Sequence, residues 1–412
     1  MPEMTKQTLQ EHTDTQLALL GGEVTLKRKP PAWPFIDESD CQALLDVLQS
    51  RTWGGYHESV AELERRFAEY HETKFGIATA NGTVSLEIAL IAGGIRPGDE
   101  VIVPPITFVA SATAIARVGA VPVFVDVDPQ TINLNPEACE EVISERTRGI
   151  VLVHFAGCPA NLDRFKELCE RHDLFLIEDC AHAHGAAWKN HRVGSFGQFG
   201  SFSFQGSKNM TAGEGGILVT SDPELAEQAH SISNQGRRTG GAWYEHVRLG
   251  TNARLTGFQA ALLLRQLERL PGQVATRMER AARLREGLKE IGGLAPTPER
   301  LDERVTSHGY HLFSMRLDEG AFNNASHSRI IEALQAEGLP ITGGYPHPIY
   351  RNELFKQHPH IVHPCPEAET YCKSAVWMPQ NVLLADEEWI DDALTAIRKV
   401  RQGARGLAVS GG

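Results

Sequence analysis

Strand-like runs and helical stretches alternate along this chain between residues 75 and 220. The strand-like runs are short and rich in valine and isoleucine, whereas the stretches between them have apolar residues at helical spacing. The runs lie at 75–80, 100–103, 121–126, 149–154, 174–179 and 217–220, and the helical stretches at 83–90, 111–118, 136–143 and 162–171. This alternation predicts an α/β fold with a mostly parallel sheet, helices on both faces, and ligands at the carboxyl ends of the strands.

A long helical stretch at 257–291 predicts the link to a second, smaller domain. Gly292 and Gly293 end that stretch, and the strand-like and helical patterns that follow predict a small α+β C-terminal domain. We expect the charged run at 277–285 to be the solvated face of the long helix. The expected organisation is a weakly ordered segment at 1–30, a large domain at 31–292, a small domain at 293–402 and a tail at 403–412.

The charge and the cysteines limit the partners and the compartment. The formal net charge is −12, which argues against nucleic acid or an anionic membrane as the main partner, because both require a basic surface. The start of the chain has no apolar signal segment, and no apolar run is as long as a membrane span. The seven cysteines are scattered without Cys-x-x-Cys spacing. We therefore expect reduced thiols and a cytoplasmic protein.

Lys208 lies in a Gly-rich segment between two strand-like runs, which predicts an amine at the mouth of the sheet. Asp179 ends a buried-looking strand 208 − 179 = 29 residues earlier. A lysine that forms a Schiff base and a carboxylate that keeps a pyridinium nitrogen protonated are the two groups that a pyridoxal phosphate (PLP) enzyme requires. Each residue alone is often only a turn residue.

A third element precedes these two. Asn81-Gly82-Thr83 forms the turn between a strand-like run and a helical stretch. The free amides of Gly82 and Thr83, the threonine hydroxyl and the positive end of the helix dipole suit a phosphate. A phosphate cradle, an acid and a lysine in this order predict a PLP site.

Several motifs give the chain a family resemblance: Asn81-Gly-Thr83, Pro104-Pro-Ile-Thr-Phe108, Glu178-Asp-Cys-Ala-His-Ala-His-Gly185, Ser201 to Gly216, and Gly250-Thr-Asn-Ala-Arg-Leu255. With these motifs the chain resembles the DegT/DnrJ/StrS sugar and cyclitol aminotransferases over about residues 33–400. The likeness is greatest to the aminocyclitol and 3-amino-5-hydroxybenzoate branch. It implies the type I, aspartate aminotransferase-like PLP fold.

The resemblance also implies roles for single residues. Lys208 would hold PLP and move the proton during transfer, Asp179 would face the ring nitrogen, and Phe108 would stack on the ring. His182 would contact the cofactor, although a core histidine remains the alternative. Ser203 and Gln205 would join Gly82 and Thr83 around the phosphate. Asn252 would reach the phosphate of the neighbouring subunit, which implies a homodimer with shared active sites.

The resemblance implies transfer of an amino group from L-glutamine or L-glutamate to a keto-cyclitol or keto-sugar. Nucleotide-linked keto-sugars and a hydroxybenzoate synthase-like dehydration remain alternatives. Lys208 argues against the dehydratases in which a histidine replaces the lysine, and the acidic balance argues against a DNA-binding regulator. Prolines interrupt the histidine-rich loop at 358–365, so we expect no metal site. The candidate substrate residues are Trp53, Tyr56, Arg237, Tyr345, His347, Tyr350 and Trp377.

Overall fold

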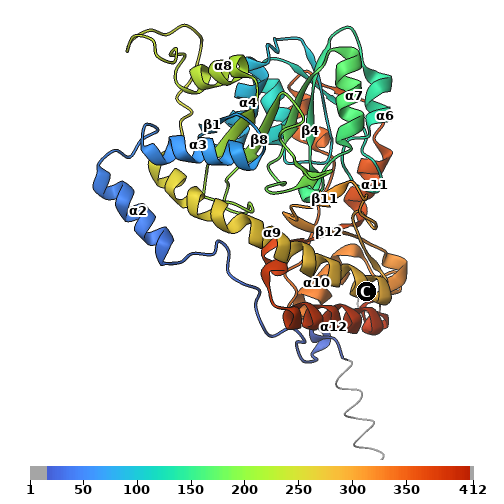
Figure 1. The fold of residues 1–412 in the computed structure, drawn as a ribbon. Helices are drawn as coiled ribbons and strands as arrows, with labels where there is room; N and C mark the ends of the chain where they lie inside the picture. Colours follow the sequence, from blue (N-terminus) through green and yellow to red (C-terminus); the bar gives the residue numbers. More distant parts are fainter. Residues whose placement is uncertain (1–15, 409–412) are drawn as a thin grey trace, which may run out of the picture.

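The computed structural model describes residues 16–408, and positions 1–15 and 409–412 lie outside the described residues. A large sheet with helices around it occupies the upper part of the view in Figure 1, and a smaller sheet lies below it. The long helix α9 (Gly257–Ile291) runs between the two parts, as the sequence predicts.

The large sheet has eight strands in the order β1-β9-β8-β5-β4-β2-β3-β14. Neighbours from β8 to β14 pair in parallel, whereas β9 is antiparallel to both β1 and β8. This confirms the mostly parallel sheet. The strands are β1 (Phe75–Thr79), β2 (Glu100–Val103), β3 (Val121–Phe124), β4 (Thr147–Val153), β5 (Phe175–Asp179), β8 (Phe199–Ser203), β9 (Gly216–Thr220) and β14 (Ile361–Val362).

Helices cover both faces of this sheet because its strands bury both. In β4, Ile150 and Leu152 belong to one apolar core and Val151 to another, as the period of two along a strand requires. The first core is closed by α3 (Glu58–Tyr70), α6 (Pro136–Val142), α7 (Leu162–His172) and the first half of α9; the second by α4 (Gly82–Ala92), α5 (Ala110–Arg117) and α8 (Pro223–Ser233). The fold is therefore a doubly wound α/β layer structure.

The second half of α9 packs into a separate core around a four-stranded antiparallel sheet, in the order β10-β12-β15-β13. Its elements are β10 (Leu294–Pro296), β12 (Leu312–Leu317), β13 (Thr342–Gly343), β15 (Ala375–Pro379), α10 (His327–Ala336), α12 (Glu387–Gly403) and α13 (Arg405–Ala408). Other elements are α2 (Glu38–Ser50), α11 (Pro366–Ser374) and a small sheet of β6 (Ala187–Trp188), β7 (His191–Arg192) and β11 (Val305–Ser307).

Segments on each side of the boundary expected near residue 292 pack with the part of the molecule on the other side. The segment at 1–30 lies partly outside the described residues, but within it Leu17 and Leu26 are buried in the small core. In the opposite direction, β14 comes from the C-terminal part of the sequence and joins the large sheet beside β3. The division into domains at 292 thus stays a prediction.

One expectation about α9 is wrong. Arg277, placed on the solvated face, is 0% exposed, and Leu284 is buried as well. The reason is geometric: a run of nine residues spans more than two helical turns, so some of its side chains must face inward. Arg283 does lie at the surface, where it pairs with Asp391. Within residues 16–408, no helix combines the length and the apolar character needed to cross a membrane.

Candidate active site

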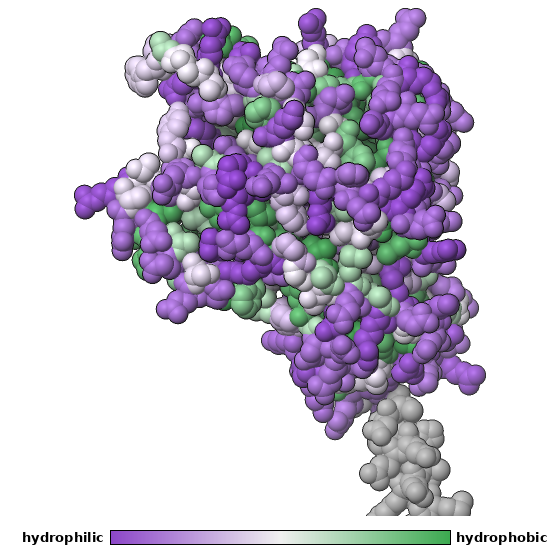
Figure 2. Space-filling view, viewed as in Figure 1, coloured by the Kyte–Doolittle hydropathy of each residue, from purple (hydrophilic) through white to green (hydrophobic). Residues whose placement is uncertain are grey.

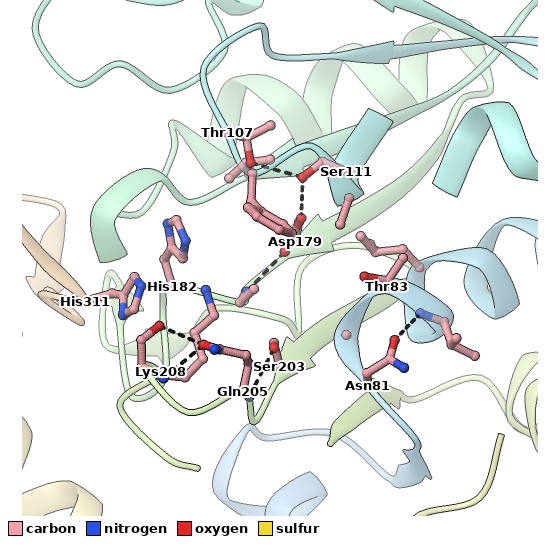
Figure 3. Close-up of a pocket in the computed structure, with 18 of the residues that line it drawn as sticks. Asn81, Thr83, Thr107, Ser111, Asp179, His182, Ser203, Gln205, Lys208 and His311 are labelled. Carbon is pink, nitrogen blue, oxygen red and sulfur yellow. Dashed lines mark hydrogen bonds between the residues drawn. The ribbon is translucent and has the colours of Figure 1, made fainter. Parts of the chain in front are cut away.

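A cavity of about 840 Å³ lies at the carboxyl ends of the central strands (Figure 3). Asp179 ends β5, Ser203 ends β8, and Lys208 follows β8 in the loop before β9. The predicted residues that line the cavity are Gly82, Thr83, Phe108, Asp179, His182, Ser203, Gln205, Lys208, Tyr345 and Trp377. Most of these positions meet because they follow the carboxyl ends of strands at one edge of the large sheet, whereas Trp377 lies in the small sheet and Tyr345 follows its strand β13.

Lys208 is held in a tight turn. Its backbone amide donates to the carbonyl of Gln205 at 2.9 Å, and the Gln205 side chain accepts from both the amide and the hydroxyl of Ser207. Burial lowers the pKa of the Lys208 amine to about 8, although the Asp179 carboxylate acts in the opposite direction. More of this amine is neutral near pH 7 than of an ordinary lysine, which favours nucleophilic attack.

Asp179 is buried and held in place by hydrogen bonds. Its Oδ2 accepts from the Ser111 hydroxyl at 2.7 Å and its Oδ1 from the Ala181 amide at 3.1 Å, while Thr107 in turn contacts Ser111 at 3.0 Å. Burial raises the pKa of Asp179, whereas the two hydrogen bonds and Lys208 lower it. A cationic ring nitrogen placed against this carboxylate would oppose the effect of burial and favour its ionised form.

The start of α4 opens onto the cavity at the place where the sequence predicts a phosphate cradle. Asn81 caps the helix by accepting from the Val84 amide, and no described residue accepts from the Gly82 or Thr83 amides, which belong to residues that line the cavity. A Cβ on Gly82 would lie 2.7 Å from the Cβ of Ser203. Only glycine therefore lets the helix start approach β8 this closely, and the arrangement suits a phosphate.

Two histidines lie side by side next to Lys208 (Figure 3). The ring centroids of His182 and His311 are 4.4 Å apart at an interplanar angle of 31°. Burial holds the pKa of both imidazoles well below the usual range, and Lys208 lowers it further. Both rings are therefore neutral near pH 7, and the Nδ1 atom of each has no hydrogen-bond partner among the described residues.

Some predicted residues lie elsewhere in the chain. Trp53 packs against Phe258; Tyr56 bonds Asn234 and receives a hydrogen bond from Arg237; Asn252 lies opposite Asn234; His347 bonds the carbonyl of Pro348; and Tyr350 bonds Glu369. Within residues 16–408, the lining of the cavity includes none of these six residues (Trp53, Tyr56, Arg237, Asn252, His347 and Tyr350). Their roles in substrate or cofactor binding stay predictions.

Sequence reasoning missed several residues of this site. Asn81 could have been found, since asparagine before Gly-Thr at a helix start is a common cap. Ser111 bonds Asp179 from 68 residues away, Thr107 bonds Ser111, and His311 comes from the small-domain side of the chain. No local pattern in the sequence indicates such long-range contacts.

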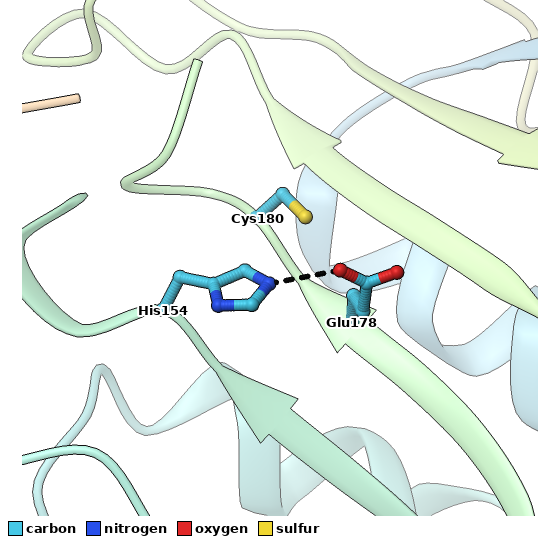
Figure 4. Close-up of side chains that lie close together, drawn as sticks. All are labelled: His154, Glu178 and Cys180. Atoms are coloured by element: carbon cyan, nitrogen blue, oxygen red, sulfur yellow. Dashed lines mark hydrogen bonds and ion pairs between the residues drawn. The ribbon is translucent and has the colours of Figure 1, made fainter. Parts of the chain in front are cut away.

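His154, Glu178 and Cys180 form a buried cluster behind the cavity that resembles a metal site (Figure 4). The Ala160 amide donates to His154 Nδ1, so His154 Nε2 carries the proton and donates to Glu178 at 3.0 Å. Glu178 also accepts from three backbone amides of the 194–197 turn. Burial raises the pKa of the Cys180 thiol. The donor atoms are thus already engaged or protonated, and the cluster fits a structural anchor better than a metal site.

Comparison with known proteins agrees with this geometry. The chain matches the DegT/DnrJ/EryC1/StrS aminotransferase family over residues 34–397. It is 38% identical to the L-glutamine:2-deoxy-scyllo-inosose aminotransferase of Micromonospora echinospora, over 95% of this chain and 99% of the relative. It is also 38% identical to the L-glutamine:scyllo-inosose aminotransferase of Streptomyces griseus, with the same coverage. A crystal structure of 3-amino-5-hydroxybenzoic acid synthase superposes with a TM-score of 0.84 at 35% identity, covering 92% of this chain and 99% of that one.

Proposed function

Since the chain belongs to the DegT/DnrJ/EryC1/StrS aminotransferase family, we propose that it uses PLP to move an amino group from L-glutamine to a keto-cyclitol. The observation that carries this proposal is the convergence of Gly82, Asp179 and Lys208 on one cavity. These three positions lie in different strand–turn units, and each has the chemistry that one part of the cofactor needs.

The residues present fit PLP. The open amides of Gly82 and Thr83 suit its phosphate, the buried Asp179 carboxylate suits its ring nitrogen, and the Lys208 amine suits its aldehyde. Phe108 lines the same cavity and is 58% exposed, so its ring is free to cover a bound ring. The cavity of about 840 Å³ has room for a cofactor and a cyclitol together.

Bound PLP supplies an aldehyde that takes up amines and a ring that delocalises negative charge. Lys208 Nζ, whose pKa burial lowers to about 8, gives up its proton more readily than an ordinary lysine and would be the group that moves a proton at the substrate carbon. The Asp179 carboxylate, held by Ser111, would keep the proton on the ring nitrogen. His182 and His311 stay neutral beside Lys208 and thus leave a bound substrate without an added positive charge.

A free cyclitol suits the cavity better than a nucleotide-linked sugar. Arg117 is the arginine among the described residues that line the cavity, and its side chain already pairs with Glu87. A diphosphate would need unpaired cations there. Tyr345 and Trp377 instead offer ring faces and polar tips, which suit a ring of hydroxyl groups. We also place the protein in the cytoplasm, as its seven cysteines are all free.

Single-turnover amination tests the substrate class. The protein loaded with pyridoxamine phosphate is mixed with scyllo-inosose, with 2-deoxy-scyllo-inosose, or with a nucleotide-linked keto-sugar. With a cyclitol ketone only, we expect amine product and the return of PLP bound to the lysine, which absorbs light near the edge of the visible range. Adding L-glutamine should then restore the pyridoxamine form. Reaction with the nucleotide sugar alone would replace the proposed substrate, and an aromatic product would indicate a hydroxybenzoate synthase.

The proposed dimer explains the exposed apolar side chains on one side of the molecule. In the segment at 236–250, Trp243 is 81% and Leu249 96% exposed, and α2 exposes Leu45 and Leu48. The segment and α2 project from the left of the view in Figure 1, and Figure 2 shows apolar residues exposed among polar ones on that side. Large exposed apolar patches mark interaction sites. The exposed Asn252 adjoins this segment, so a second copy seated here would receive its side chain.

Mixed dimers test whether Asn252 completes the partner's site. Lys208→Ala and Asn252→Ala subunits, each poorly active alone, are mixed after dissociation. A mixed dimer has one site with both lesions and one with neither, so activity should return to roughly a quarter of the sites at equal mixing. The measurement is the specific activity after exchange, with mixing confirmed by mass.

The matched control mixes Lys208→Ala with Asp179→Asn subunits. Both lesions then lie in the half of the site that one chain supplies, so no intact site forms and no activity should return. Equal recovery in both mixtures, or a fully active monomer, would contradict the shared site.

A further inference from the structure

Arg277 is a buried cation without a described carboxylate partner. It is 0% exposed, its Nε and Nη2 both donate to Gln380 Oε1, at 3.0 Å for Nε, and its Nη1 has no partner among the described residues. Burial lowers its pKa to about 9, so the guanidinium is still charged at neutral pH. Removing a cation from water without a counter-ion is strongly unfavourable. Stability alone therefore does not explain this residue.

The guanidinium contacts the segment that holds the active-site lysine. It lies over the indole of Trp33 with 5.5 Å to the ring centroid, the geometry of a cation–π contact. The indole Nε1 of Trp33 in turn donates to the backbone carbonyl of Lys208 at 3.1 Å. Gln380, Arg277, Trp33 and Lys208 thus form a continuous chain of contacts.

These contacts join three distant parts of the molecule. Trp33 precedes α2, and Gln380 begins the short helix at 380–384 beside the small core. Arg277 lies on α9 between Val274, which packs in the large core, and Ala281, which packs in the small one. A second contact runs in parallel, because the side chain of Asn381 donates to the carbonyl of Pro31 at 2.8 Å. The chain of contacts therefore links the small core to the backbone of the lysine.

We propose that Arg277 and Trp33 are positioning residues that direct the Lys208 amine towards the cofactor aldehyde, an inference that rests on the proposed role of Lys208. The turn at Lys208 is fixed on its amide side by Gln205, and Trp33 fixes its carbonyl side. With both peptide planes held, the side chain leaves the backbone in one direction, into the cavity. Preorganised placement of a nucleophile raises its rate of attack without new contacts to the ligand.

Two ligands separate positioning of the lysine from general loosening of the site. PLP bonds to Lys208, whereas pyridoxamine phosphate occupies the same cradle and ring site without that bond. The test uses the full-length apo-protein. It measures how fast PLP becomes bound to the lysine, from the absorbance near the edge of the visible range, and the dissociation constant for pyridoxamine phosphate. The variants are Trp33→Phe, which removes the indole donor, and Arg277→Met, which replaces the cation with an apolar chain of similar length.

We expect each variant to capture PLP about three- to tenfold more slowly, the size of one lost hydrogen bond. Binding of pyridoxamine phosphate should change by less than about twofold. Because both residues act through one chain of contacts, the double variant should be no slower than the slower single variant. Arg277→Met should be as stable as the parent or more so, since apolar replacement of a buried ion is often neutral or stabilising.

Trp389→Phe is the matched control. The Trp389 indole also donates to a backbone carbonyl, that of Arg28 at 3.0 Å, but it does not contact the lysine turn. Capture of PLP by this variant should equal that of the parent. The proposal would be overturned if Trp33→Phe captured PLP as fast as the parent, or if it weakened the binding of pyridoxamine phosphate as much as it slowed the capture of PLP. If Arg277→Met does not fold, Trp33→Phe decides alone. A parent protein that binds neither ligand would instead refute the proposed function.

Discussion

Replacing Lys208 with alanine is expected to abolish multiple turnover, with a loss of more than about four orders of magnitude in rate, while the protein stays folded and still binds pyridoxamine phosphate. The amine is the one described lining group whose pKa, lowered by burial to about 8, suits both bonding to the aldehyde and moving a proton. The cradle at Gly82 and the carboxylate of Asp179 do not depend on it. The measurement is kcat with excess donor and acceptor, alongside the dissociation constant for pyridoxamine phosphate.

Two further variants make this result specific. Lys208→Arg keeps a positive charge but cannot bond to the aldehyde, so it should be as inactive as the alanine variant. Lys356→Ala, which removes an exposed lysine paired with Glu353, should be fully active. Borohydride treatment of the parent should attach the cofactor to the peptide that contains Lys208. Normal multiple turnover by Lys208→Ala would remove the central claim about this site.

The parts of the fold that follow from local patterns could be predicted from the sequence. The strand–helix alternation is confirmed by the parallel order of β5, β4, β2 and β3, because a buried strand and an amphipathic helix each have a short-range period. The turn positions of Asp179 and Lys208 follow from the same patterns, since a parallel sheet places the residues after its strands at one edge.

The parts that depend on distant contacts could not be predicted. Arg277 has the composition of a solvated helix residue, and only the packing of two cores and Trp33 around α9 buries it. Similarly, β14 belongs to the large sheet although it follows β12 of the small sheet in the sequence. Nothing within a few residues of these positions determines such neighbours. The proposed role of Asn252 depends on a second chain, so no contact within this chain could indicate it.

Asp179→Asn is the variant with the second largest expected effect. Asparagine keeps the size of the side chain and can accept from Ser111 or from the Ala181 amide, but it has no charge with which to hold the proton on the ring nitrogen. Without that proton the ring is a much weaker electron acceptor, so the rate should fall by about three orders of magnitude, the scale of a lost charge interaction in a buried site. The measurements are kcat and the absorbance spectrum of the bound cofactor.

Ser111→Ala separates the charge of Asp179 from its orientation. This variant removes the 2.7 Å hydrogen bond to Oδ2 but leaves the carboxylate and its bond from the Ala181 amide. The loss of one hydrogen bond should cost about tenfold, far less than the loss of the charge. If Asp179→Asn lost less than about tenfold, another group would hold the ring nitrogen. If Ser111→Ala lost as much as Asp179→Asn, the orientation of the carboxylate rather than its charge would control the reaction.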